Sequence, residues 1–260
     1  MAAGDVAVNI TTNNSRACAK FDGVDDKVDI GNITLLDGRT KLTMSVWFKT
    51  KGAISETRRI FGQSRNGGGA PIIYITASGL LRVDMDTSLD IASASRFDDS
   101  LWHNVVYTYD AGLGSDNMKL YADGTLLGSA NNTSTINHTT DDHLTFGSAS
   151  DDGANSQYFL GSISDGIIYD RPLTQAEVIK LFAGRTITNG LIGHWKLQDD
   201  YTDSTGSNDG TNTGTYLTIE DDTISLTISG QRVVASASGA YIQTGMKGGQ
   251  IVSVAITETP

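Results

Sequence analysis

The stretch that decides the fold is residues 21–28, which read FDGVDDKV. An apolar residue leads into a glycine turn with three aspartates, and the chain then returns to an alternating pattern. Further short strings follow in order along the chain, namely SVWF at 45–48, WHNV at 102–105, LYADG at 120–124 and GSISDGIIYDRPL at 161–173. Short alternating segments separated by turn residues are typical of antiparallel strands. Their regular succession predicts a β-sandwich.

The composition agrees with an all-β chain. Its 260 residues include 29 glycines, and only four of the 30 acidic residues are glutamates. Aspartate favours turns because its short side chain hydrogen-bonds to nearby backbone, so an aspartate-rich chain is rich in loops. A chain of this length can bury a sizeable core. Its single cysteine, Cys18, excludes an internal disulfide framework.

Alternation of apolar and polar residues predicts individual strands. The clearest is 41–49, and the others are 71–77, 80–86, 102–110, 144–148 and 158–169. The segments 118–122 and 125–130 flank Asp123-Gly124, the kind of dipeptide that a two-residue hairpin turn prefers because both positions take positive φ. We therefore expect a hairpin at this point.

One helix is expected near residue 180. Thr174 and Glu177 form a capping-box pattern, and Gly184 supplies the glycine that commonly follows a helix. Polar or glycine-rich segments predict loops at 54–69, 131–142 and 148–156. Such loops are expected to carry recognition while the sandwich stays rigid, and Tyr158 is the aromatic residue that borders one of them.

The five strings together resemble laminin-G-like, concanavalin A-like jelly-roll domains over roughly residues 17–183. The family patterns FDG-x-DD-x-V, SVWF, WHHV, LYVDG and G-x-IDE-x-R-IYNRAL match them in order and spacing. The resemblance implies an antiparallel jelly-roll β-sandwich with one short helix. The family usually has two carboxylates where this chain has Ser164 and Asp165, so the first is absent here.

A second departure concerns chain order. Residues 190–210 resemble the strand GLVAYWPFD…DSSGNGNDGT, which in the family precedes the FDG strand, but here they follow the helix. The domain is either circularly permuted, so that this strand returns to its own sandwich, or the strand completes a neighbouring subunit of a swapped oligomer. A degenerate second repeat is the third alternative, although little chain remains for it.

These patterns divide the chain into an N-terminal arm (1–16), the sandwich (17–215, with 190–215 supplying the permuted or swapped strand) and a small C-terminal β module (216–260). In that module Ile224–Ile228 and Ile251–Ile256 alternate without charge. Strands of this kind need a partner to cover them. They form either a module for assembly or anchoring, or extra strands on the same sandwich.

Charge and hydropathy exclude several partners. The formal net charge is −11, and no basic patch of the kind that nucleic acid requires is visible. No apolar stretch is long enough to predict insertion into a bilayer. The first residues lack the basic and apolar regions of a secretory signal, so none is expected.

The sequence predicts no catalytic residue. Glycoside hydrolysis needs two carboxylates across the scissile bond, whereas Asp84 and Asp86 are neighbours on one face of a predicted strand. The histidines show no zinc pattern, and His103 and His194 each adjoin a tryptophan, which favours structural roles.

Calcium is the one cofactor that the sequence suggests. It binds six to eight oxygen ligands, mainly loop carboxylates and carbonyls, and the family resemblance implies a site at the rim of the sandwich. The candidate ligands are Asp22, Asp25, Asp26, Asp151, Asp152 and Asp203.

The first functional hypothesis is a non-enzymatic structural or adhesion protein of a virus particle, such as a bacteriophage tail, fibre or capsid-decoration protein. It would form a homo-oligomer, contact other virion proteins and meet a cell-surface glycan. A recognition fold without an export signal and with terminal assembly strands motivates it. The alternative is a carbohydrate- or protein-binding module of a bacterial surface or secreted protein, and a glycan-cleaving enzyme is the least favoured.

Overall fold

The computed structural model describes residues 6–11, 15–63, 69–86, 89–137, 142–151, 154–206, 208–220 and 223–228. By its contacts the chain divides into a large unit, Ala17–Thr218, and a second unit to which Met1–Arg16 and Ile219–Pro260 contribute. The described part of the second unit is a two-stranded antiparallel sheet of β1 (Val6–Thr11) and β19 (Thr223–Ile228). The predicted strand Ile251–Ile256 lies outside the described residues.

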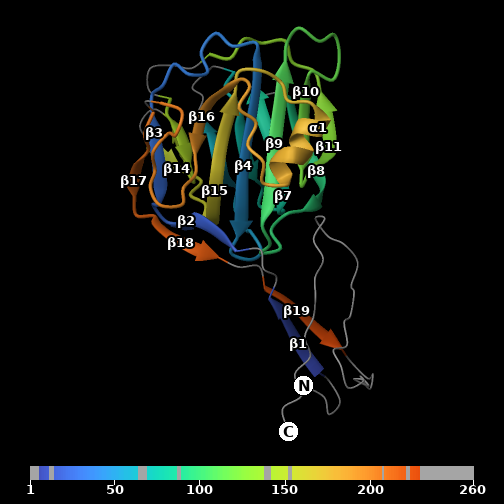
Figure 1. The fold of residues 1–260 in the computed structure, drawn as a ribbon, viewed down its shortest axis with the longest axis vertical. Coiled ribbons are helices and arrows are strands. Elements are labelled where there is room, and N and C mark those ends of the chain that lie inside the picture. The colour runs from blue at the N-terminus through green and yellow to red at the C-terminus, as the bar shows by residue number, and fades with distance from the viewer. Residues whose placement is uncertain are drawn as a thin grey trace. The chain divides into compact units, whose positions relative to one another are not determined.

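The large unit is a sandwich of two antiparallel sheets (Figure 1). The first sheet has the order β11 (Thr125–Ala130), β10 (Met118–Ala122), β9 (His103–Asp110), β4 (Lys41–Thr50), β15 (Leu160–Tyr169), β2 (Arg16–Asp22) and β18 (Tyr216–Glu220), and β16 (Leu191–Trp195) also pairs with β15. The second has the order β17 (Thr211–Thr213), β3 (Lys27–Gly31), β12 (Leu144–Phe146), β5 (Arg58–Gln63), β6 (Ile72–Ile75), β7 (Leu80–Asp86) and β8 (Leu89–Arg96). The predicted fold class, a concanavalin A-like jelly roll with one short helix, is confirmed.

The core lies between the two sheets because each strand turns one side of its alternating pattern inward. On β4 the predicted inward residues Leu42, Met44, Val46 and Phe48 are all fully buried in it. The predicted hairpin also forms, with Asp123 at φ +50° and Gly124 at φ +76° between β10 and β11. Positive φ at both central positions is what a type I′ turn requires.

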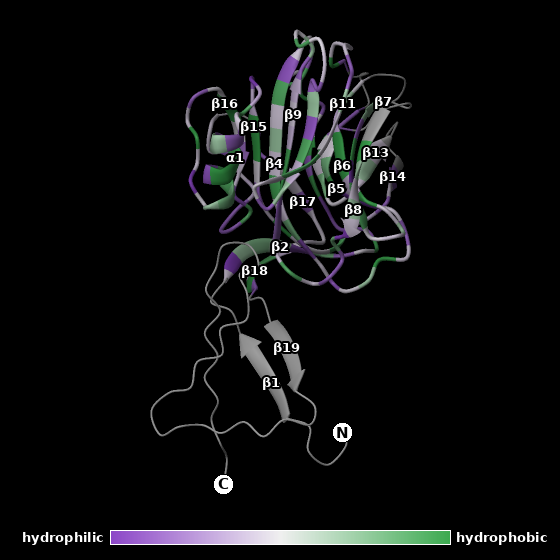
Figure 2. Ribbon diagram, turned by 90° about the vertical axis from the view of Figure 1, so that its right-hand side faces the viewer, coloured by the Kyte–Doolittle hydropathy of each residue, from purple (hydrophilic) through white to green (hydrophobic). Residues whose placement is uncertain are grey.

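The helix α1 (Gln175–Phe182) covers the outer face of the eight-stranded sheet. It begins with the predicted capping box of Thr174 and Glu177, and Gly184 follows it at φ +75°. Val178 and Leu181 pack against outward-facing side chains of the sheet, namely Val106, Tyr121, Ile167 and Tyr169. Figure 2 shows the helix on one side of the sandwich, with both hydrophobic (green) and hydrophilic (purple) residues along it.

The strand β16 pairs antiparallel with one half of β15, and β2 pairs with the other half, so the two strands follow one another along the same edge. Trp195 at the end of β16 is fully buried, with its ring 6.3 Å from Phe61 and 5.9 Å from Phe146. Nε2 of His194 lies 3.0 Å from Oδ1 of Asp165, the carboxylate that remains in the altered family motif. Residues 190–210 thus contribute to the core of their own chain's sandwich in this structure.

Two predicted loops are wrong in part. The segment 54–69 contains β5, a strand inside the seven-stranded sheet. A register shift between Arg59 and Phe61 breaks the alternation there, so the sequence pattern does not show the strand. The segment 148–156 contains a small hairpin of β13 (Ala149–Asp151) and β14 (Ala154–Ser156).

The strand β18 lies just beyond the predicted boundary at residue 215, and the division of the chain into three parts stays a prediction. The strand β18 belongs to the eight-stranded sheet, so the sandwich extends beyond the residue at which the C-terminal module was expected to begin. In the part of the chain that the structure describes, no helix has the length and apolar character needed to cross a membrane.

Candidate binding site

The seven-stranded sheet carries an open hollow of about 370 Å³ on the face that points away from the core. On this face Tyr74, Arg82 and Asp84 are partly exposed, and they alternate along β6 and β7 with the buried residues Ile73, Ile75, Leu81 and Val83. The described residues that line it are Thr57, Arg59, Ile72, Tyr74, Thr76, Arg82, Asp84 and Gln157. The helix covers the other sheet, so this face retains an open polar surface.

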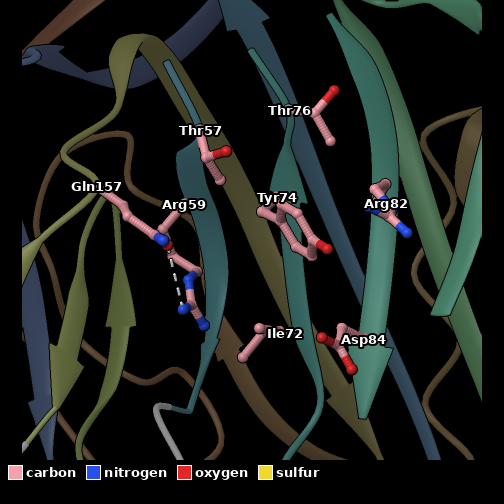
Figure 3. Close-up of a pocket in the computed structure, with 8 residues that line it drawn as sticks. All are labelled: Thr57, Arg59, Ile72, Tyr74, Thr76, Arg82, Asp84 and Gln157. Atoms are coloured by element: carbon pink, nitrogen blue, oxygen red, sulfur yellow. Dashed lines mark hydrogen bonds between the residues drawn. The ribbon is translucent and has the colours of Figure 1, made fainter. Parts of the chain in front are cut away.

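Strand register places the lining side chains in two rows. Arg59 on β5 pairs with Tyr74 on β6, and Tyr74 pairs with Arg82 on β7. In the neighbouring row Ile72 pairs with Asp84. Figure 3 shows Tyr74 between the two arginines, with Asp84 beside the row. One aromatic ring is therefore flanked by two cationic side chains, with a carboxylate close by.

Arg59 is held in the wall of the hollow by Gln157. Arg59 is 6% exposed, and its Nη2 donates a hydrogen bond of 3.3 Å to Oε1 of Gln157. The backbone N–H of Arg59 also donates a hydrogen bond of 2.8 Å to the backbone carbonyl of Gln157. Gln157 has φ +53°, a left-handed conformation that is uncommon for a residue other than glycine. This turn brings both its carbonyl and its side chain to Arg59.

The other arginine, Arg82, lies near the Tyr74 ring, with its guanidinium carbon 6.0 Å from the ring centroid. Guanidinium groups supply donors only, the carboxylate of Asp84 accepts, and hydroxyl and amide groups such as those of Thr57 and Gln157 do both. The hollow can thus form hydrogen bonds of both kinds with a polar ligand, and the face of Tyr74 provides an apolar contact.

The structure describes the side chains of four predicted calcium ligands, and these lie in two places. Asp22, Asp25 and Asp26 come together in the turn between β2 and β3, with one carboxylate oxygen from each within 4.8 Å of the others. Oδ2 of Asp26 accepts a hydrogen bond from the backbone N–H of Asp22 at 2.7 Å, and Oδ1 of Asp22 accepts one from Val24 at 2.8 Å. Burial, followed by the neighbouring carboxylates Asp22 and Asp25, raises the pKa of Asp26 although the bond from Asp22 lowers it. Three carboxylates are the hard oxygen donors that calcium prefers, so these residues fit the ion.

Asp203 is not a member of this group. Its buried carboxylate accepts hydrogen bonds from the backbone of His194 at 3.0 Å and of Thr205 at 2.9 Å, and from the side chains of Thr205 and Asn208. Burial raises the pKa of this carboxyl, but the hydrogen bonds outweigh it and the pKa is lowered overall. Asp203 thereby organises the loop after β16. The side chain of Asp151 and the whole of Asp152 lie outside the described residues.

Of the residues that line the hollow, only Asp84 was considered individually from the sequence, and it was set aside as a catalytic candidate. The signal that could have found them is the alternation of Tyr74, Arg82 and Asp84 with apolar neighbours, which places polar residues on the face away from the core. Arg59 gave no such signal because it lies beside the irregularity in β5. The predicted recognition loops supply only Thr57 and Arg59 to the lining.

Comparison with known proteins identifies the class. A laminin-G-like family model, described as the concanavalin A-like lectin/glucanases superfamily, matches residues 22–179. The chain belongs to this family. No curated protein sequence matches it significantly.

Solved structures share the fold at low sequence identity. A heptameric SAP-like pentraxin from Limulus polyphemus has a TM-score of 0.57 at 16% identity, over 78% of this chain and 94% of that one. A candidate carbohydrate-binding protein from Bacteroides ovatus has a TM-score of 0.58 at 16% identity, over 84% of this chain and 60% of that one. The CBM40 module of a Ruminococcus gnavus sialidase, bound to α2,6-sialyllactose, has a TM-score of 0.52 at 16% identity, over 65% of this chain and 97% of that one.

Proposed function

We propose that this chain is a non-enzymatic carbohydrate-binding module that holds a glycan in the hollow over β5, β6 and β7. The observation that carries the proposal is the row of Arg59, Tyr74 and Arg82 across three paired strands. A sugar presents hydroxyl groups around its edge and C–H groups on its faces, so it needs both hydrogen-bonding partners and a flat apolar surface. The hollow provides both on rigid strands, which lowers the entropic cost of binding.

The carboxylates of the hollow support binding without cleavage. Asp84 is the one carboxylate among the described residues that line it. Glycoside hydrolysis generally needs two carboxyl groups on opposite sides of the scissile bond. The side chain of Asp86, the second acid of this strand, lies outside the described residues.

The structural neighbours support the proposal only through the fold. One of them is a sialidase CBM40 module with a bound sialyllactose, and a second is a candidate carbohydrate-binding protein. The same type of sandwich therefore carries a sugar site in another protein. The residues that would bind a sugar in this chain come from its own geometry.

The proposal is tested with Tyr74→Ala on a glycan array and then by titration calorimetry. We expect the parent chain to bind a set of glycans on the array. The variant should bind the same glycans at least about tenfold more weakly, because a central aromatic contact is lost. Tyr216→Ala is the matched control, since this tyrosine is 57% exposed on β18 and does not line the hollow. Unchanged binding by Tyr74→Ala would overturn the proposal, and so would a parent chain that binds no glycan at all.

We also propose that the turn between β2 and β3 binds calcium through Asp22, Asp25 and Asp26. In this site the ion would neutralise three adjacent carboxylates and fix the turn. Millimolar calcium should raise the Tm of the protein, and Asp26→Asn should remove most of that rise. An equal rise in the variant, or none in the parent chain, would count against the site.

A second candidate function is assembly into a larger particle, including the virus particle that the sequence suggested. The observation that favours it is the pairing of β1 with β19, two uncharged strands from opposite ends of the chain, in a sheet separate from the sandwich. Native mass spectrometry tests this role. A closed homo-oligomer that dissociates when charges are introduced into β19 would support it, and a monomer at micromolar concentration would favour a simple binding module on a bacterial surface or secreted protein.

A further inference from the structure

The charge of the hollow differs in sign from that of the whole chain. Its described lining carries two guanidinium groups and one carboxylate, whereas the chain has a formal net charge of −11. An acidic chain repels anions at most of its surface, and long-range repulsion is screened at physiological salt beyond about 8 Å. Local positive charge at this place therefore selects for an anionic group that reaches the hollow itself.

The spacing of the two arginines suits one sugar ring. Arg59 and Arg82 lie in the same row on strands separated by β6. Paired strands are about 4.8 Å apart, so the two backbones are roughly 10 Å apart. Tyr74 occupies the floor between them (Figure 3). A ligand ring above Tyr74 would therefore have one arginine strand on each side.

Arg59 is also held before a ligand arrives, since it is 6% exposed and bonded to Gln157. The guanidinium carbon of Arg82 lies 6.0 Å from the centroid of the Tyr74 ring. A guanidinium remains charged at any physiological pH and presents a planar fork of donors to a carboxylate or a similar oxyanion. Hydrogen bonds of this kind are stronger than those between neutral groups.

From these features we infer that the hollow selects an acidic sugar, whose carboxylate or sulfate lies between Arg59 and Arg82 above Tyr74. The inference rests on the proposed glycan-binding function and names the substrate class of the same site. Asp84, at the other row, accepts hydrogen bonds from hydroxyl groups of the same ligand. It also disfavours a second anionic group at that end, so the ligand has a defined orientation.

The test uses the full chain and matched pairs of glycans. One pair is sialyllactose and lactose, another is a galacturonate oligomer and its methyl ester, and a third is 3′-sulfated lactose and lactose. We expect at least one acidic member to bind about tenfold or more tightly than its neutral partner, since a hydrogen bond to a charged group has that effect. The carboxylate and sulfate arms identify which anionic group is recognised.

Arginine variants show whether the hollow is responsible. Arg82→Met should reduce the preference for the acidic member toward unity, and Arg82→Lys should retain part of it. Arg185→Met is the matched control because it removes the same charge from an exposed position after α1. The Tm of each variant establishes that it is folded.

The outcomes separate the inference from the proposed function. If glycans bind and Tyr74→Ala abolishes binding, but acidic and neutral members bind equally, the function stands and the acidic specificity falls. If an acidic glycan is preferred but Arg82→Met leaves that preference unchanged, the inference also falls. If no glycan binds, both are overturned.

Discussion

His103 is the clearest example of a single residue whose environment sets its charge. Its Nδ1 lies 2.8 Å from Oδ2 of Asp123, and its Nε2 lies 2.9 Å from Oδ1 of Asp99. Burial lowers the pKa of the imidazole, but hydrogen bonds to the two carboxylates outweigh this and raise the pKa to about 9. The histidine is therefore protonated at neutral pH, and it links the start of β9 to the hairpin turn at Asp123.

This pairing predicts a specific dependence of stability on pH. A folded-state pKa above the unfolded value of 6.5 stabilises the fold fully below pH 6.5, and the contribution is lost as the pH rises through about 9. The loss is on the order of 3 kcal/mol at most. Urea unfolding at pH 6 and pH 9.5 should show it in the parent chain, and His103→Asn should show a much smaller difference. Equal pH dependence in both proteins would contradict the protonated pair.

At the scale of single elements, α1 combines a capping box with an ion pair. Glu177 accepts hydrogen bonds from the backbone of Thr174 at 2.9 Å and from Arg171 at 2.6 and 3.0 Å. The Arg171 guanidinium, followed by the Thr174 bonds, lowers the pKa of Glu177 to about 2 although burial opposes this. The same carboxylate thus fixes the start of the helix and the chain that leads into it.

Glu177→Ala should reduce the free energy of unfolding by about 1–2 kcal/mol at pH 7, because it removes a cap and a partly exposed ion pair. The folded-state pKa is below the unfolded value of 4.5, so this contribution is present above pH 4.5 and disappears as the pH falls through about 2. Chemical denaturation at pH 7 and pH 2 measures it. Lys180→Ala, at an exposed position of the same helix, should cost no more than about 0.5 kcal/mol, and an equal cost for both variants would count against the cap.

The elements that the sequence predicted correctly are those with local signals. The hairpin of β10 and β11 and the helix follow from residues that lie next to one another, such as Asp123-Gly124 and the pair Thr174 and Glu177. The strand β5 was missed because its irregularity near Ile60 disrupts the alternation. Alternation along β6 and β7 could have indicated a polar outer face, but the grouping of these residues in one hollow depends on the register between three strands, which no local pattern determines. The acidic turn at Asp22 was predicted as a unit, since its members are close in sequence.

At the scale of the whole molecule, the sandwich depends on a strand that comes late in the chain. Trp195 packs on Phe61 and Phe146, whose rings stack at 4.2 Å between β5 and β12 of the opposite sheet. Its Nε1 also donates a hydrogen bond of 2.6 Å to the carbonyl of Asn208. The segment that follows β16 contributes β17, which pairs with β3 in the other sheet. Residues 190–213 therefore connect both sheets.

Because Trp195 packs against both sheets, its loss should lower the stability of both sheets in one cooperative unit. Trp195→Ala should cost about 3–5 kcal/mol through the cavity that it leaves. Native-state hydrogen exchange should then show reduced protection in β4, β9 and β5 as well as in β16, because the most protected amides exchange through global unfolding. Leu126→Ala, at a position 47% exposed on β11, should leave that protection nearly unchanged. Loss of protection confined to residues 190–213 would instead mean that the sandwich is complete without this segment, and it would contradict the role of Trp195 in joining the two sheets.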